Sequence, residues 1–216
     1  MKKIIFAGHM KHKFLPDSTG KRDLKKNIVL LLFIAAVILG AAAGALGGKY
    51  ADAELMKSLD IVFLTNFQLR SKAGMLSVFT ASFAANFIVL LTIFLLGLTL
   101  WGELCVILIP LIKGYGYGLT IGYLYSTYGM MGIFYNLLII LPGAFLFSVV
   151  VAAAAKESFV NSVRLLAMFF KKAVSDDPRV QMKHYLLSML WLLFLAALSS
   201  AADMLFSLMF SWIFGF

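Results

Sequence analysis

The chain has 216 residues, of which 62% are hydrophobic, and a formal net charge of +9. Soluble domains are roughly 45–50% apolar, and a chain with a mean hydropathy of +0.95 has too little polar surface to cover a water-soluble fold of this size. The composition therefore excludes a soluble protein and indicates a polytopic integral membrane protein. The positive charge then favours loops on the cytoplasmic side of a membrane over a nucleic-acid site, so we expect membrane lipids and no nucleic acid as partners.

Five segments are long and apolar enough to cross a membrane as helices, which takes about 20 predominantly apolar residues. The predicted spans are residues 27–48, 78–100, 104–125, 132–155 and 185–213. They form a single membrane domain, residues 27–213, behind a basic tail of residues 1–26. We therefore predict an all-α integral membrane protein, a bundle of five transmembrane helices.

The distribution of Lys and Arg predicts the orientation, because cytoplasmic loops collect basic residues. Eight lie in the tail 1–26 and six in the loop 156–184, against four between the first two spans and none in the turn 126–131. A cytoplasmic N-terminus thus leaves fourteen basic residues inside and four outside, and five spans place the C-terminus outside the cytoplasm. The first span is predicted to be an uncleaved anchor, since its apolar run is longer than that of a signal peptide.

Two further segments have apolar residues on one helical face. In residues 50–67 and 156–172 the apolar positions recur with the helical period. Such amphipathic helices lie at the membrane interface or pack beneath their own bundle. We predict interfacial helices in both places, the second within the basic cytoplasmic loop 156–184.

Small residues recur every four positions in two of the predicted spans. The GYG in the third span is no potassium filter, because Lys113 precedes Gly114 and the segment crosses the membrane by itself. Small residues at i and i+4 share one helix face and let two backbones approach closely. The two series either pack against each other, which we favour, or pack against a partner, which could be another protein or a second copy of the chain. They are Ala36, Gly40, Gly44 and Gly48 in the first span and Gly114, Gly118 and Gly122 in the third.

Few polar or helix-breaking residues lie at membrane depth, where ionisable groups usually mark function. Lys113 either snorkels to the cytoplasmic interface or pairs with a carboxylate, and Asp203 in the fifth span is the other ionisable candidate. Asn86 can hydrogen-bond between helices, and Pro142 is expected to kink the fourth span. Known enzyme motifs are missing, so we predict no catalytic, cofactor or metal site.

The segment 103–172 resembles the stage II sporulation protein M family. The likeness rests on LIPLIKGYGYGLTIGYL at 108–124 and YGMMGIFYNLLIILPGAFLF at 128–147. The family shows a lysine-glycine before a glycine-rich helix, a short turn with small residues, and an apolar helix interrupted by proline. The family often has Gln or Glu directly after that proline, whereas this chain has Gly143 and Ala144. The family also often has a Glu near the outer end of its last helix, and Asp203 is the corresponding acidic residue here. The matching positions in this segment are Lys113, Gly114, Gly118, Gly122, Gly129, Gly132 and Pro142, and upstream of it Asn86 is similar to a residue of the family's second helix.

The resemblance implies a non-enzymatic scaffold in the bacterial plasma membrane. It would recruit the membrane-anchored peptidoglycan hydrolases called stage II sporulation proteins D and P to the sporulation septum, where wall remodelling drives engulfment. The alternative is a small permease or transporter subunit with a path near Lys113, Pro142 and Asp203, because charges and kinks also mark transport paths.

Overall fold

The computed structural model describes residues 18–50, 54, 74–170 and 178–210. Every element in these ranges is a helix, and five helical segments are long and apolar enough to span a membrane. This confirms the predicted all-α, five-span bundle. The segments are Ile28–Gly48, Leu76–Gly97, Gly102–Tyr128, Met130–Phe170 and Arg179–Phe210.

The helices follow one another in the order α1 (Ser18–Gly48), α5 (Met75–Gly97), α6 (Gly102–Val106), α7 (Leu108–Tyr128), α8 (Met130–Tyr135), η1 (Asn136–Ile140), α9 (Leu141–Phe170) and α10 (Pro178–Phe210). Most of the predicted tail 1–26 and of the amphipathic segment 50–67 lies outside the described residues. Of the tail, only residues 18–26 are described, and they form the first turns of α1.

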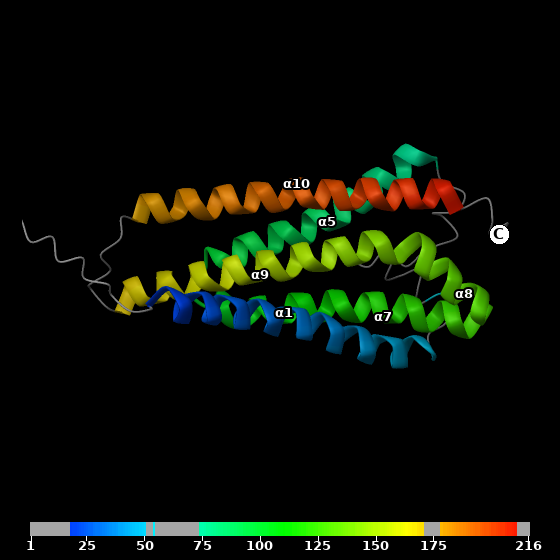
Figure 1. The fold of residues 1–216 in the computed structure, drawn as a ribbon, viewed down its shortest axis with the longest axis horizontal. Coiled ribbons are helices and arrows are strands. Elements are labelled where there is room, and N and C mark those ends of the chain that lie inside the picture. The colour runs from blue at the N-terminus through cyan, green and yellow to red at the C-terminus, as the bar shows by residue number, and fades with distance from the viewer. Residues whose placement is uncertain (1–17, 51–53, 55–73, 171–177, 211–216) are drawn as a thin grey trace, which may run out of the picture.

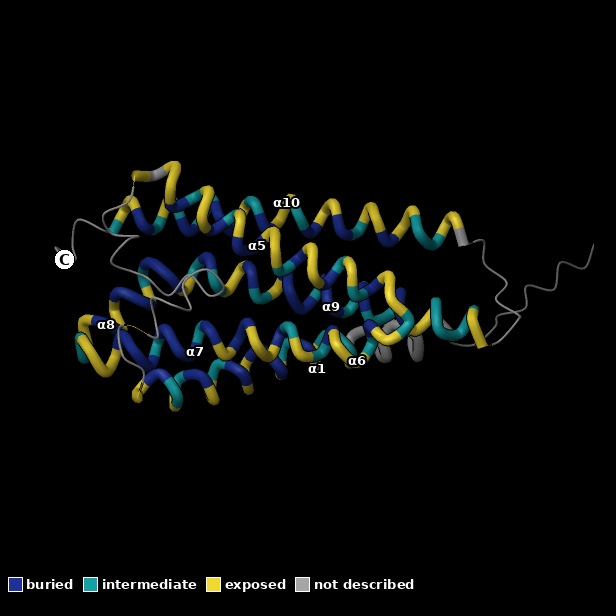
Figure 2. The backbone as a smooth tube through the Cα atoms, turned by 180° about the vertical axis from the view of Figure 1, so that it is seen from behind, coloured by how far each residue is buried: buried dark blue, intermediate teal, exposed yellow. Residues whose placement is uncertain are grey.

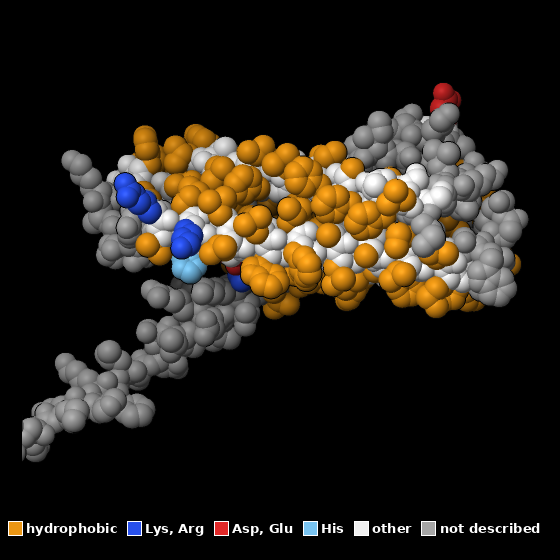
Figure 3. Space-filling model, turned by 90° about the horizontal axis from the view of Figure 1, so that it is seen from above, with side chains coloured by type: hydrophobic (Ala, Val, Ile, Leu, Met, Phe, Trp, Pro, Cys, Tyr) orange, Lys and Arg blue, Asp and Glu red, His pale blue; other side chains and the backbone are white. Residues whose placement is uncertain are grey.

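Helix α9 is the centre of the bundle. The pair α1 and α7 lies on one side of it and the pair α5 and α10 on the other (Figure 1), and α9 packs against each of these four helices. Figure 2 shows the buried residues on the faces that the helices turn toward one another. The outward faces carry exposed Leu, Ile and Phe side chains, and Figure 3 shows them as a broad hydrophobic surface. That surface fits a lipid environment, where the backbone's hydrogen bonds are satisfied within the helices.

Two prolines coincide with breaks in regular helix geometry. Pro142 has no N–H to donate to the preceding turn, and the chain before it widens into the π-helical turn η1. Pro110 lies in the first turn of α7, and the third span is divided at Ile107 into α6 and α7. The fourth span continues past its predicted end at residue 155: α9 runs on to Phe170, so most of the amphipathic segment 156–172 is the direct continuation of that helix.

Two glycines shape the turn between the third and fourth spans. Gly129 ends α7 with φ 58°, a left-handed conformation that glycine adopts without strain. A side chain at Gly132 would overlap the backbone carbonyl of Leu124. Gly129 therefore permits the reversal, and Gly132 lets α8 lie directly on the end of α7.

Candidate functional site

The small residues of the first and third spans face each other. A Cβ atom added to any of the six seam glycines would overlap a backbone atom of the other helix. Residue numbers increase together along both helices, so α1 and α7 are parallel, with their backbones in direct contact. The glycines meet backbone carbonyls in the pairs Gly40 with Leu111, Gly44 with Tyr115, Gly48 with Leu119, Gly114 with Val37, Gly118 with Ala41 and Gly122 with Ala45.

This contact, the α1–α7 seam, uses the glycines within one chain. In lipid there is little hydrophobic drive between helices, and close van der Waals packing replaces it. Ala36 is buried as well, but the carbonyl over Gly114 belongs to its neighbour Val37. At the far end, the Ser126 hydroxyl donates to the Lys49 carbonyl at 3.3 Å. The seam faces are thus occupied by each other along much of the span.

A layer of polar side chains joins α5, α9 and α10 inside the other half of the bundle. The Ser82 hydroxyl donates to Oδ2 of Asp203. Asn86 donates from Nδ2 to Oγ of Ser200 at 3.1 Å, and Ser199 donates to the Gly143 carbonyl at 2.9 Å. All these side chains are buried. Hydrogen bonding compensates for their burial in an apolar medium.

Asp203 lies against the backbone of α9 at Gly143. A Cβ at that position would overlap the carboxylate. The family often places Gln or Glu next to this proline, whereas here the glycine leaves space that a carboxylate from α10 fills. Pro142 itself is partly buried and lies beside this contact.

Lys113 is only 3% exposed, so its ammonium does not snorkel to a surface. Its Nζ lies 5.5 Å from the centroid of the Tyr117 ring and 5.4 Å from that of Phe147. An aromatic face attracts a desolvated cation. The two rings therefore stabilise the charge in the interior.

Lys113 and Asp203 approach one face of α9 from opposite sides. Lys113 reaches Phe147 from α7, and Asp203 reaches Gly143 from α10. Gly143 and Phe147 are four residues apart and so share a helix face, about 6 Å apart along the axis at about 1.5 Å per residue. The two predicted intramembrane charges are thus brought to adjacent turns of the central helix.

A second polar cluster, which the sequence did not reveal, lies where α5 ends. The last carbonyls of a helix have no intrahelical partner. Asn161 donates to the Gly97 carbonyl at 2.8 Å, Ser162 to Thr99 at 2.7 Å, and Tyr185 to Phe94 at 2.9 Å. The extended end of α9 and the start of α10 thus satisfy the end of α5. The only available signal was the polar stripe within the amphipathic segment 156–172.

Within the described residues, no group of three or more His, Cys, Asp or Glu side chains is arranged to hold a metal ion. The cysteine Cys105 is exposed. The polar groups described above connect the helices, and Lys113 and Asp203 lie against adjacent turns of α9.

A comparison with protein-family models decides the family. The model for stage II sporulation protein M matches residues 29–201 of this chain. The chain belongs to this family. Neither the curated proteins nor the solved structures gave a significant match.

The match to the stage II sporulation protein M family covers the α1–α7 seam, Lys113 and the Pro142 turn. Asp203 lies two residues beyond its end. Among the features that carried the resemblance in the sequence, the glycines set helix contacts and the proline follows a π-helical turn.

Proposed function

We propose that this protein is a non-enzymatic membrane scaffold. It holds membrane-anchored peptidoglycan-remodelling enzymes at the septal or engulfing membrane of a bacterium during endospore formation. The observation that carries the proposal is membership of the stage II sporulation protein M family over residues 29–201. The partners that the resemblance implies are stage II sporulation proteins D and P.

The bundle has features that suit a scaffold. The α1–α7 seam and the polar layer around Asp203 are contacts within one chain that hold the helices against one another. Its outer faces are apolar, and on α10 the exposed rings of Trp191 and Phe194 pack edge to face, with centroids 6.1 Å apart. The transmembrane anchors of partner proteins would pack against such faces through van der Waals contact.

Capture of the tagged protein from its native host in mild detergent, followed by mass spectrometry, tests the proposal. Recovery of peptidoglycan hydrolases, absent when an unrelated tagged multi-pass protein is used, would support the scaffold. Recovery of a transport ATPase or a solute-binding protein would contradict it.

A permease subunit is the second candidate, and one observation favours it. Lys113 and Asp203 are both buried at membrane depth and approach the same face of α9 beside Pro142. Ionisable residues inside membranes often line an ion or substrate path. Uptake of a solute by vesicles that contain the protein, abolished by Lys113→Met without loss of protein, would favour this candidate.

A further inference from the structure

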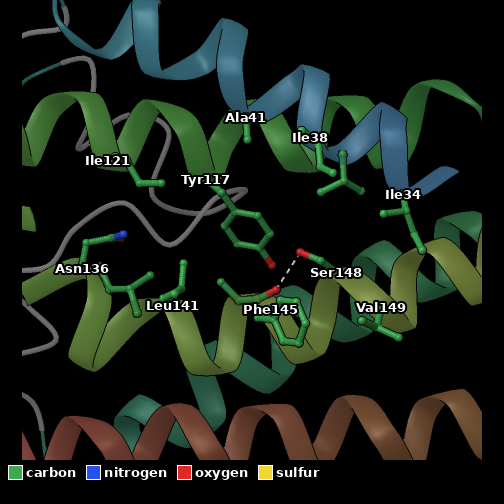
Figure 4. A pocket seen from close by; sticks show the side chains of 13 residues that line it. Ile34, Ile38, Ala41, Tyr117, Ile121, Asn136, Leu141, Phe145, Ser148 and Val149 are labelled. Carbon is green, nitrogen blue, oxygen red and sulfur yellow. Dashed lines mark hydrogen bonds between the residues drawn. The ribbon is translucent and has the colours of Figure 1, made fainter. Parts of the chain in front are cut away.

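An elongated cavity lies between α1, α7 and the η1–α9 helix (Figure 4). Its volume is about 460 Å³, and its lining is almost entirely apolar. Ile38, Phe145 and Val149 line it and are also exposed on the outer surface. The cavity therefore opens sideways from the bundle. Because the helices around it are membrane spans, its opening faces lipid chains.

The dimensions of the cavity fit one hydrocarbon chain. Along the η1–α9 helix its lining runs from Asn136 to Val149, about 20 Å at about 1.5 Å per residue. At about 30 Å³ for a group the size of a water molecule, the volume holds roughly 15 such groups, and a methylene group is of similar size. A transmembrane helix, about 10 Å across with its side chains, is too thick to enter.

One end of the cavity carries a polar group. Asn136, the first residue of η1, is 7% exposed, and its amide points into the cavity. Asn136 belongs to the π-helical turn η1, and such turns often occur at functional sites. Two hydroxyl side chains also line the cavity: Tyr117 extends into it from α7 (Figure 4), and Ser148 donates to the Ala144 carbonyl at 2.7 Å.

The register of the α1–α7 seam places Asn136 near one boundary of the membrane. Ile121 lies with Asn136 at the same end of the cavity (Figure 4). It immediately precedes Gly122, which packs against Ala45 and Gly48 at the end of the first span. Asn136 therefore lies near the level at which α1 ends. The ester carbonyls of a phospholipid lie at the edge of the hydrocarbon layer, within reach of this depth.

We propose that this cavity binds one acyl chain of a membrane glycerophospholipid. The Asn136 amide donates a hydrogen bond to the ester carbonyl of that chain, and the methyl end lies between Ile34 and Val149. Apolar walls supply dispersion contacts along the chain, and the amide fixes its position along the cavity. The proposal is independent of the scaffold function.

Photo-crosslinking in reconstituted vesicles tests the proposal. The purified protein is placed in vesicles of phosphatidylethanolamine and phosphatidylglycerol that contain a trace of phosphatidylethanolamine with a diazirine on one acyl chain. A diazirine at the methyl end should label peptides around Ile34 and Val149. A diazirine next to the carbonyl should label peptides around Ile121 and Asn136.

Two substitutions in the cavity and one control outside it make the test specific. Ala144→Leu fills the cavity from α9 and should reduce both labels several-fold, while Ala84→Leu on the exposed face of α5 should leave them unchanged. Asn136→Leu should reduce the label near the carbonyl more than the label at the methyl end, because it removes only the polar anchor.

The outcomes separate a bound chain from ordinary surrounding lipid. Labelling spread over all exposed faces and unaffected by Ala144→Leu would overturn the proposal, as would labelling by the two probes at the same place. Should Ala144→Leu fail to fold, native mass spectrometry of the wild-type protein still decides. Retention of one phospholipid after delipidation supports the site, and a lipid-free protein or one that retains only a partner polypeptide contradicts it.

Discussion

The carboxylate of Asp203 occupies the space that a side chain at Gly143 would fill. Asp203 reaches this position from α10, where the Ser82 hydroxyl of α5 donates to it. A single glycine on the central helix thus allows an ionisable group to lie against the α9 backbone. Gly143 is therefore required for packing of the Asp203 carboxylate against α9, and this role is separate from the effect of Pro142 on the helix.

Gly143→Ala should destabilise the protein. In a helix interior alanine is favoured over glycine by about 0.8–1.0 kcal/mol, so helix propensity alone would make this variant more stable. Overfilling a packed interior costs about 1–3 kcal/mol. A net loss of stability would therefore come from overlap of the new Cβ with the Asp203 carboxylate. Thermal unfolding in detergent measures the change. Gly74→Ala is the control, because a Cβ there has no neighbour within 4 Å. Asp203→Ala should restore part of the loss, and a Gly143→Ala protein as stable as wild type would contradict the account.

The α1–α7 seam predicts different effects on stability for substitutions at two glycines three residues apart on α1. A Cβ at Gly44 overlaps the backbone of Tyr115, whereas one at Gly47 meets side-chain atoms, of which the Tyr115 hydroxyl is the nearest, at 3.0 Å. The hydroxyl can move and the backbone cannot. We expect Gly44→Ala to lower the melting temperature and the amount of folded protein, and Gly47→Ala to change neither. Gly118→Leu on the facing helix should prevent folding, and normal levels of that variant would count against the seam.

Lys113 and Asp203 should be energetically coupled through α9. Removing one buried charge leaves the environment of the other less well compensated. We therefore expect Lys113→Met and Asp203→Asn each to be destabilising, and the double variant to lose less than the sum, by about 0.5–3 kcal/mol. The free energies of unfolding of the wild type, the two single variants and the double variant, measured in detergent, form the double-mutant cycle that tests this coupling. Strictly additive losses would show that the two charges act independently.

The orientation predicted from the basic residues is tested with a reporter. Alkaline phosphatase is active only outside the cytoplasm, so a fusion after Phe216 should be active. A fusion after Lys172 in the basic loop should be inactive and serves as the control. A C-terminal fusion with green fluorescent protein that fluoresces while the phosphatase fusion stays inactive would contradict the predicted topology.

The sequence predicted the membrane class and the five spans because hydrocarbon imposes long apolar helices on any spanning chain. It also identified the glycine series, since spacing alone places such residues on one face. What spacing cannot give is the partner of each face or the register. The alignment of Gly118 with Ala41 depends on the path of the whole chain.

Other features depend on contacts between distant segments and carry little local signal. Residues 156–172 read as a separate interfacial helix, but Ser158, Asn161 and Ser162 bond to the end of α5, and that pairing keeps α9 continuous with the span. Likewise, Pro142 predicted a kink, and the π-helical turn before it became visible only in the structure. The cavity beside that turn could not be predicted, because its walls come from three different spans.

The most direct measurement of the scaffold proposal is photo-crosslinking in living cells. A photoreactive amino acid replaces one exposed residue on each of three outer helices, Leu39 on α1, Leu95 on α5 and Leu195 on α10, and buried Ile93 is the control. If the proposal is correct, at least one exposed position captures a membrane-anchored peptidoglycan hydrolase and Ile93 captures none. Capture of a transport ATPase, or of no wall enzyme at any exposed position on these three helices while the hydrolases are present, would contradict it.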